Sequence, residues 1–154
     1  MRLRTALVGL AVTISFGAHA QFSVDRRMRE CAEAAVYLAK KYARTTLDYS
    51  PASLEQVDTI LNNFRLGKYP LTPEDDAPAT FGCYTGQVMV NQLGGVWREP
   101  KPEEEPVTGK SPYVLLPKGV IVNPINKAMK LHKNGLEDSL FGYYQVVTNI
   151  LNTR

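Results

Sequence analysis

One short segment of the chain is rich in side chains that could do chemistry. Residues 47–58 read Leu-Asp-Tyr-Ser-Pro-Ala-Ser-Leu-Glu-Gln-Val-Asp, with two aspartates, one glutamate, two serines and one tyrosine. The pair Ser50-Pro51 is also typical of a helix start, because serine accepts bonds from free backbone amides and proline fits the first turn. Helix capping accounts for the serines of the segment and leaves Asp48 and Tyr49 unexplained.

The rest of the chain offers few side chains that could serve as nucleophile or base in nucleophilic catalysis. His19 lies in the N-terminal leader described below, so His132 is the remaining imidazole. A serine hydrolase would have to use His132, but no Gly-x-Ser-x-Gly motif presents a serine. A cysteine protease would need Cys31 or Cys83 as a free thiol. The sequence therefore argues against a nucleophilic hydrolase.

Metal and cofactor sites also lack the residues that they need. A structural zinc site takes four Cys or His ligands, and the chain without its leader has three. The acidic runs 74–76 and 103–105 lack the spacing and the central glycine of a calcium loop. The glycines form no dinucleotide or phosphate motif. We therefore expect no metal and no cofactor.

Glycoside hydrolysis by paired carboxylates stays open as the enzymatic alternative. It needs two acids about 5 to 9 Å apart across a groove. Asp48, Asp58 and Glu99 are candidates, although any exported domain with fifteen acids offers as many. We consider an enzyme the less favoured reading.

The N-terminus predicts export. Arg2 and Arg4 precede an uncharged, mostly apolar stretch, and Ala18-His19-Ala20 forms a small-x-small cleavage site. The stretch is shorter than the about 20 apolar residues that cross a bilayer. We therefore predict a signal peptide over residues 1–20, cleaved after Ala20, and one mature domain over residues 21–154 in the periplasm or outside the cell, not associated with a membrane after cleavage. An uncleaved N-terminal anchor is the alternative.

The mature domain is predicted to be nearly neutral. The leader carries Arg2 and Arg4 and no acid, so its loss lowers the formal charge from +3 to +1. The one basic cluster is Arg26-Arg27-x-Arg29, which is typical of an exposed helix start. A nucleic-acid partner is not expected, because such proteins concentrate an excess of Lys and Arg on one element.

Hydrophobic periodicity predicts helices before and after a small sheet. Apolar residues recur at three-and-four spacing in five segments, and short β-type runs separated by turn residues make three strands. Gly82 and Gly86, one turn apart, predict a flat strip that another element approaches closely. The fold class is therefore α+β, with helices packed on a small antiparallel sheet of about three strands. The helices are expected at 23–43, 51–64, 79–93, 125–132 and 136–151, and the strands at 96–98, 113–116 and 120–122.

Two cysteines in an exported chain favour a disulfide. Cys31 and Cys83 both fall in helical patterns that could meet in one core. Oxidising compartments favour their pairing. Two separately buried thiols are the alternative.

Several motifs together resemble a family of small bacterial domains of unknown function. That family has a Leu-Asp-Tyr-Ser helix start, a Gly-x-Tyr-x-Gly-acid-Val helix and Gly-Gly-x-Trp at the entry to a small sheet. The matching segments here are 47–50, 82–88 and 94–97, and Gln87 departs from the pattern by replacing the acid. The resemblance implies an α+β fold and no established reaction, and it further weakens a carboxylate-based enzyme.

The recurring positions have two interpretations. Buried aromatic residues usually serve the core, and the glycines serve packing and capping. The functional interpretation is that one groove between the helices and the sheet is lined by Asp48, Tyr49, Tyr84, Gln87 and Trp97.

The function that these observations favour is binding. We expect a non-enzymatic periplasmic protein that binds a protein partner, most concretely an inhibitor or immunity protein against an envelope-targeting toxin. Export, a compact domain and acidic loops able to reach a basic cleft support it. The alternatives are the glycan-acting enzyme with paired carboxylates and a carrier that holds a small ligand in the aromatic groove.

Overall fold

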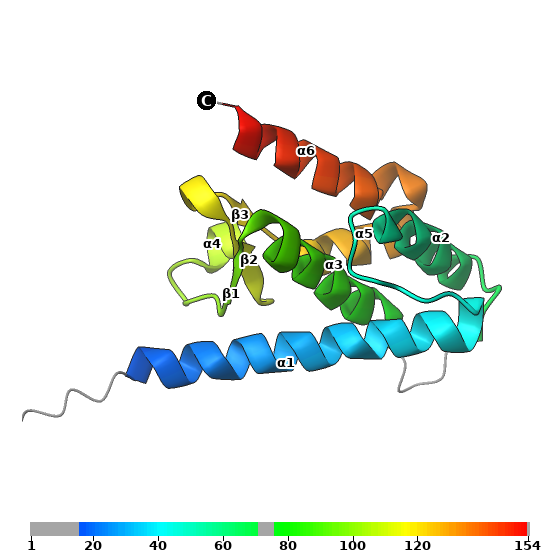
Figure 1. The fold of residues 1–154 in the computed structure, drawn as a ribbon, viewed down its shortest axis with the longest axis horizontal. Coiled ribbons are helices and arrows are strands. Elements are labelled where there is room, and N and C mark those ends of the chain that lie inside the picture. Colours follow the sequence, from blue (N-terminus) through cyan, green and yellow to red (C-terminus); the bar gives the residue numbers. More distant parts are fainter. Residues whose placement is uncertain (1–15, 71–75, 154) are drawn as a thin grey trace, which may run out of the picture.

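The computed structural model describes residues 16–70 and 76–153, with side chains from residue 23 onward (Figure 1). Of the predicted signal peptide, residues 1–15 lie outside the described residues, and the backbone of residues 16–20 is helical. The elements are α1 (Phe16–Leu38), which a π-helical turn (Ala39–Ala43) continues, α2 (Ser53–Arg65), α3 (Ala77–Leu93), β1 (Val96–Arg98), α4 (Glu105–Thr108), β2 (Tyr113–Leu115), β3 (Ile121–Val122), α5 (Pro124–Asn134) and α6 (Leu140–Asn152). The predicted α+β class is confirmed.

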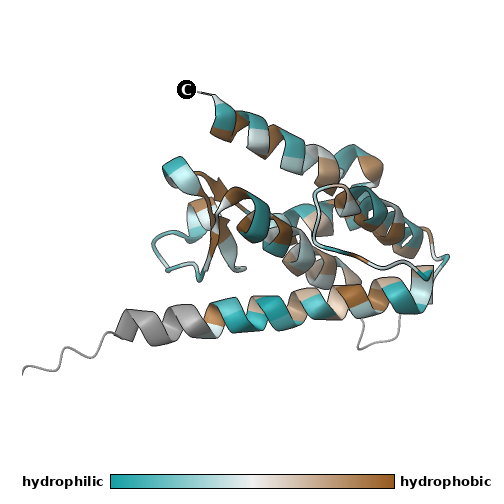
Figure 2. Ribbon diagram, viewed as in Figure 1, coloured by the Kyte–Doolittle hydropathy of each residue, from teal (hydrophilic) through white to brown (hydrophobic). Residues whose placement is uncertain are grey.

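Helix α3 is the centre of the molecule. The long helix α1 lies along one side of α3, α5 packs against α3 as well, and α2 contacts α5 and α6 (Figure 1). Apolar residues concentrate on the strands and on the inner sides of the helices, while much of α1 is hydrophilic (Figure 2). The core is thus one continuous cluster to which all the long helices contribute.

The small residues of α3 let two other elements approach its backbone. A Cβ atom added to Gly82 would lie 2.5 Å from the Ile125 Cα, and one added to Gly86 would lie 2.2 Å from the Trp97 ring. Real Cβ atoms do not come so close, so both positions need glycine. The predicted flat strip is confirmed, and Trp97 and the start of α5 occupy it.

The sheet is antiparallel in the order β1-β2-β3. Trp97 of β1 pairs with Val114 of β2, and Val114 pairs in turn with Val122 of β3. All three are buried, so one face of the sheet belongs to the core. Gly94 has φ +71° and closes α3 before β1, as the sequence predicts.

Several elements differ from prediction. Helix α1 begins at Phe16 rather than at residue 23, α2 begins at Ser53 rather than at residue 51, and α5 spans Pro124–Asn134 rather than 125–132. Helix α3 begins at Ala77 rather than at residue 79, because Asp76 accepts a hydrogen bond from the Ala79 amide at 3.3 Å and Pro78 fits the first turn. The loop predicted at 100–112 contains the short helix α4. The last helix is split at Ser139: a 3₁₀ turn (Leu136–Asp138) precedes α6.

Helix α6 is also fixed at its C-terminal end. The Nζ of Lys118, in the turn between β2 and β3, donates to the Leu151 carbonyl at 2.6 Å and to the Thr153 carbonyl at 3.0 Å. These carbonyls have no partner within the helix, and a cation at this end also interacts favourably with the negative end of the helix dipole. Within residues 16–70 and 76–153, no helix combines the length and apolarity that a bilayer crossing requires.

Candidate binding groove

A disulfide fixes the relative position of α1 and α3. Cys31 and Cys83 are bonded, with their Cα atoms 5.8 Å apart and a sequence separation of 52. The predicted pairing is confirmed. Closing a loop of this length stabilises a fold by about 4 kcal/mol in the chain-entropy description.

The candidate site is a groove between these two bonded helices, which we call the α1–α3 groove. Its main depression has a volume of about 420 Å³ and adjoins a smaller one of about 160 Å³. Arg29, Gln87 and Val90 line both, so the two form one continuous surface. The main depression is completed by Glu33, Tyr49 and Asn91, and the smaller one by Asp25, Gly95, Val96 and Trp97.

Tyr49 is the most constrained residue at the groove. Its φ is +60°, a left-handed conformation that costs a bulky residue on the order of 1 to 3 kcal/mol. Its backbone N–H donates to the Tyr84 hydroxyl at 2.7 Å, and its carbonyl accepts from the Gln92 amide at 3.2 Å. Its ring stacks on Tyr84 with centroids 4.8 Å apart. The surrounding structure therefore holds this aromatic side chain in one position beside the groove.

Tyr84 serves as the buried support of that position. It is fully buried, and its hydroxyl also lies 2.7 Å from the Ser53 hydroxyl. Burial raises the pKa of Tyr84, and burial followed by the charge of Glu33 raises the pKa of Tyr49. Both phenols are therefore neutral at physiological pH and act as hydrogen-bonding groups rather than as bases.

Asp48 has a local structural role. Its Oδ1 accepts from the Ser50 backbone N–H at 2.9 Å, and bonding from Ser50, side chain first and backbone second, lowers the pKa of Asp48. The Ser50 hydroxyl then accepts from the Ser53 N–H at 3.2 Å. The Ser50 hydroxyl accepts from a backbone amide as predicted, but α2 begins at Ser53 with Ala52 at its N-cap position, so Ser50 stabilises the turn before the helix rather than capping the helix itself. Asp48 stabilises the same turn.

A polar ladder runs along α3 into the groove. The Trp97 indole Nε1 donates to Gln87 Oε1 at 3.4 Å, and Gln87 Nε2 donates to Asn91 Oδ1 at 2.9 Å. Because Asn91 accepts through its oxygen, its amide nitrogen stays available as a donor on this exposed residue. A glutamate at position 87 could not donate to Asn91, so the Asn91 amide would have to turn over and donate to the carboxylate instead.

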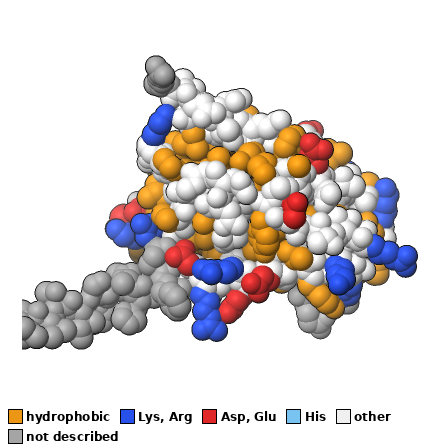
Figure 3. All heavy atoms as spheres, viewed as in Figure 1, with side chains coloured by type: hydrophobic (Ala, Val, Ile, Leu, Met, Phe, Trp, Pro, Cys, Tyr) orange, Lys and Arg blue, Asp and Glu red, His pale blue; other side chains and the backbone are white. Residues whose placement is uncertain are grey.

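Charges of both signs border the groove on α1. Arg26 and Glu30 form an exposed ion pair at 2.8 Å, and one turn along the helix Arg29 and Glu33 are exposed at the groove itself. Figure 3 shows acidic and basic side chains intermixed along this edge of the molecule. The groove therefore offers both a guanidinium donor and a carboxylate acceptor beside an aromatic ring.

The five predicted groove residues divide into three groups. Tyr49 and Gln87 line the main depression, and Trp97, 1% exposed, contributes only an edge to the smaller one. Tyr84 lies beneath Tyr49, and Asp48 is adjacent in the chain without lining the groove. Sequence reasoning missed Arg29, Glu33 and Asn91. The four-residue spacings Arg29 to Glu33 and Gln87 to Asn91 could have placed each pair on one helix face.

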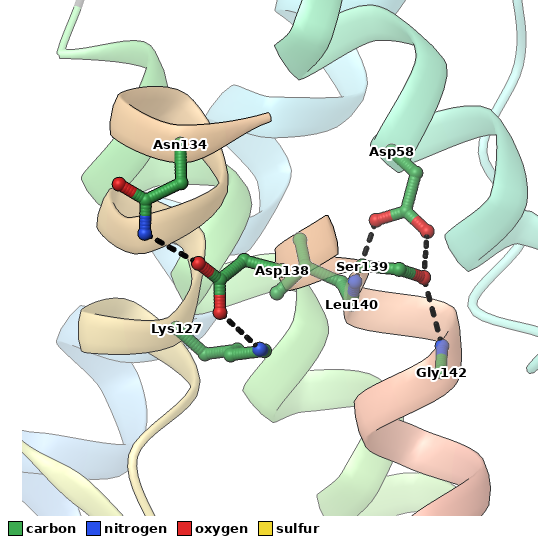
Figure 4. A network of polar contacts seen from close by, with 7 residues as sticks. All are labelled: Asp58, Lys127, Asn134, Asp138, Ser139, Leu140 and Gly142. Carbon is green, nitrogen blue, oxygen red and sulfur yellow. Dashed lines mark hydrogen bonds and ion pairs between the residues drawn. The ribbon is translucent and has the colours of Figure 1, made fainter. Parts of the chain in front are cut away.

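Asp58, one of the candidate catalytic acids, caps a helix instead. Its carboxylate accepts from the Ser139 hydroxyl at 2.5 Å and from the Leu140 amide at 2.6 Å (Figure 4). It also accepts from the Phe141 amide at 3.3 Å. The Ser139 hydroxyl accepts in turn from Gly142. Burial raises the pKa of Asp58, against the effect of these donors. Asp58 thus joins α2 to the start of α6.

The other titratable groups singled out in the sequence also have defined surroundings. Glu99 forms an exposed ion pair with Arg27. His132 is partly buried, and its Nδ1 has no hydrogen-bond partner in the part of the chain that the structure describes. Among those residues, no group of three or more His, Cys, Asp or Glu side chains is placed to hold a metal ion. The arrangement of the groove is suited to contact and hydrogen bonding.

Comparison with known proteins gives no relative for this chain. No protein-family model, no curated protein and no solved structure matches it. The resemblance to small bacterial domains of unknown function stays a prediction, and the function has to be inferred from the groove itself.

Proposed function

We propose that this chain is an exported, non-catalytic protein that binds a protein partner through the α1–α3 groove, as an inhibitor or immunity protein against an envelope-targeting toxin. The observation that carries the proposal is Tyr49. An aromatic side chain held in an unfavourable backbone conformation by its neighbours, at the edge of a groove, has the rigidity and amphipathic surface of an interface anchor.

The surroundings of Tyr49 support the same role. Arg29 offers guanidinium donors and Glu33 a carboxylate one turn away, so the rim can match a partner of mixed polarity. Arginine and tyrosine are among the residues that contribute most to protein–protein binding. The pre-formed ladder from Trp97 to Asn91 adds a donor whose orientation is already fixed.

The location is supported by the disulfide. Disulfides persist in oxidising compartments and are rare in the cytosol. The three acids considered for catalysis have other partners, which supports a binding role: Asp58 caps a helix, Asp48 caps a turn and Glu99 pairs with Arg27. Export itself and the identity of the partner remain part of the proposal.

The test is partner capture followed by measured affinity. The chain, expressed with its native leader, is cross-linked in the periplasm, and the captured protein is purified for titration. Tyr49→Ala and Arg29→Glu are expected to weaken binding by about thirtyfold or more, the effect of losing an interface anchor. Tyr37→Ala is the control, because Tyr37 is 63% exposed on α1 and does not line the groove.

The outcomes separate the proposal from its alternatives. Equal binding by the Tyr49 and Arg29 variants would place the interface elsewhere. Turnover of purified peptidoglycan, lost in a single acidic variant, would replace binding by catalysis. A deletion strain as resistant as the parent to toxin-delivering competitors would remove the immunity role.

A further inference from the structure

A partly exposed segment before β2 combines acidic and apolar side chains. This segment, which we call the α4 knob, consists of residues 103–107. Val107 is 76% exposed. Lys101 pairs with Glu104 at 3.9 Å, and neither Glu103 nor Glu105 forms an ion pair with any described residue. The knob thus presents one large apolar side chain and two unpaired carboxylates.

A depression with the complementary character lies on α5. This surface, the α5 depression, has a volume of about 480 Å³. Lys127 is paired with Asp138 at 2.6 Å, whereas Lys130 is exposed and makes no ion pair with any described residue. Helix α5 carries three lysines and no acid. The lining residues are Asn123, Asn126, Lys127, Met129, Lys130 and Tyr143.

The knob and the depression are neighbours in the fold. The Asn123 side-chain amide donates to the Thr108 carbonyl at the end of α4, at 2.5 Å. A Cβ atom on Gly109 would lie 2.9 Å from the Asn126 amide nitrogen. The knob therefore stands at the rim of the depression, and the exposure of Val107 means that it does not fill the depression of its own chain.

We infer that two copies of this chain form a two-fold dimer in which the α4 knob of each enters the α5 depression of the other. When a two-fold axis passes between the knob and the depression, the knob of each copy contacts the depression of the other at the same time. Both patches are then covered, and the assembly closes at two copies. Glu103 and Glu105 then face Lys130, and Val107 is covered by Met129 and Tyr143 of the second copy. Opposite charges give the contact its orientation, and the apolar side chains leave water.

The experiment measures self-association of the disulfide-bonded chain by sedimentation velocity over a wide concentration range. The unchanged chain is expected to be dimeric, and added salt should weaken the dimer. Glu105→Lys and Lys130→Glu should each raise the dimer dissociation constant by about tenfold or more. The double variant should recover much of that loss, because the reversed charges attract again.

An apolar pair of variants separates the knob from other exposed surfaces. Val107→Ser should weaken the dimer, whereas Val146→Ser should not, since Val146 is 56% exposed on α6 and does not line the depression. Circular dichroism checks that each variant is folded. A chain that is monomeric at every concentration overturns the inference. So does a dimer that is insensitive to the charge reversals and to Val107→Ser, or one that the Val146 variant disrupts equally.

Discussion

Helices α3 and α6 are held in place by different kinds of interaction. The middle of α3 is buried on several sides, from Phe81 through Met89, and the disulfide attaches it to α1. Helix α6 buries Leu140, Tyr144 and Val147, exposes Val146 and Ile150, and is fixed by polar side chains at its two ends. Helix α3 therefore depends on close packing and α6 on its caps, so the two should respond to different substitutions.

Removing the disulfide should give the largest loss of stability. Replacing Cys31 and Cys83 together by serine is expected to lower the free energy of unfolding by about 4 kcal/mol, because the unfolded chain is no longer constrained. Urea unfolding of the oxidised chain and of the double variant measures the difference. Reducing agent should destabilise the unchanged chain and leave the variant unaffected. Equal midpoints for the oxidised chain and the variant would contradict the role given to this bond.

A matched pair of glycine substitutions tests the packing difference directly. In Gly86→Ala the new methyl would lie 2.2 Å from the Trp97 ring, so we expect a loss of about 1 to 3 kcal/mol despite the better helix propensity of alanine. In Gly142→Ala the nearest atom is the Ser139 hydroxyl at 3.4 Å, so stability should be unchanged or raised by up to about 1 kcal/mol.

Thermal and urea unfolding of both variants measure this pair. Loss of Trp97 packing in Gly86→Ala should also change the tryptophan emission, since the chain has one tryptophan. Similar effects at the two positions would show that α3 is no more tightly packed than α6.

Asp58→Ala tests the N-terminal cap of α6. The substitution leaves the buried Leu140 amide without its acceptor, so we expect a loss of about 2 kcal/mol. Hydrogen exchange should show the greatest loss of protection in the first turn of α6. Loss of protection confined to α2, on which Asp58 lies, would contradict a capping role. Thr59→Ala, an exposed neighbour on α2, is the control.

The ionisation of Asp58 gives this cap a dependence on pH. Burial raises the pKa of Asp58 in the folded state above its ordinary value of 3.8. When the pKa of a carboxyl is higher in the folded than in the unfolded state, protonation favours the folded state. The resulting contribution to the free energy of unfolding is complete below the unfolded-state pKa and is lost as the pH rises through the folded-state pKa. The stability of the unchanged chain relative to Asp58→Asn should therefore fall as pH rises from about 3 to 7. Urea titrations at each pH measure it. A relative stability that rises with pH would mean that the three donors outweigh burial.

The sequence is enough to predict the elements whose signals are local. Three-and-four spacing gives α1, α2 and α3, and Gly94 gives the end of α3. The break at Ser139 cannot be predicted from such spacing, because the three-and-four pattern of apolar residues continues across it. The acceptor that makes the break favourable is Asp58, which lies 81 residues earlier. Helix α4 is missed for a related reason, since four residues among prolines and glutamates have no period.

The candidate site shows the same division. Tyr49 and Gln87 follow from local motifs, and the Asp48 turn follows from its neighbours in sequence. Arg29 and Glu33 are exposed charges on a long helix, which carry no signal of their own until the disulfide places α1 against α3. The support of Tyr49 by Tyr84 joins residues 35 positions apart. Its left-handed backbone depends on this long-range contact.

The C-terminal cap of α6 should contribute least. Lys118 is exposed, and its bonds to the Leu151 and Thr153 carbonyls compete with water, so Lys118→Ala is expected to lower stability by about 0.5 kcal/mol. The loss should appear as faster hydrogen exchange in the last turn of α6, with the first turn unchanged. Lys133→Ala, another exposed lysine, is the control. An effect as large as that of Asp58→Ala would mean that the two ends of α6 matter equally. A much smaller one supports a helix that is anchored at its buried N-terminal cap and is free to open from its C-terminal end.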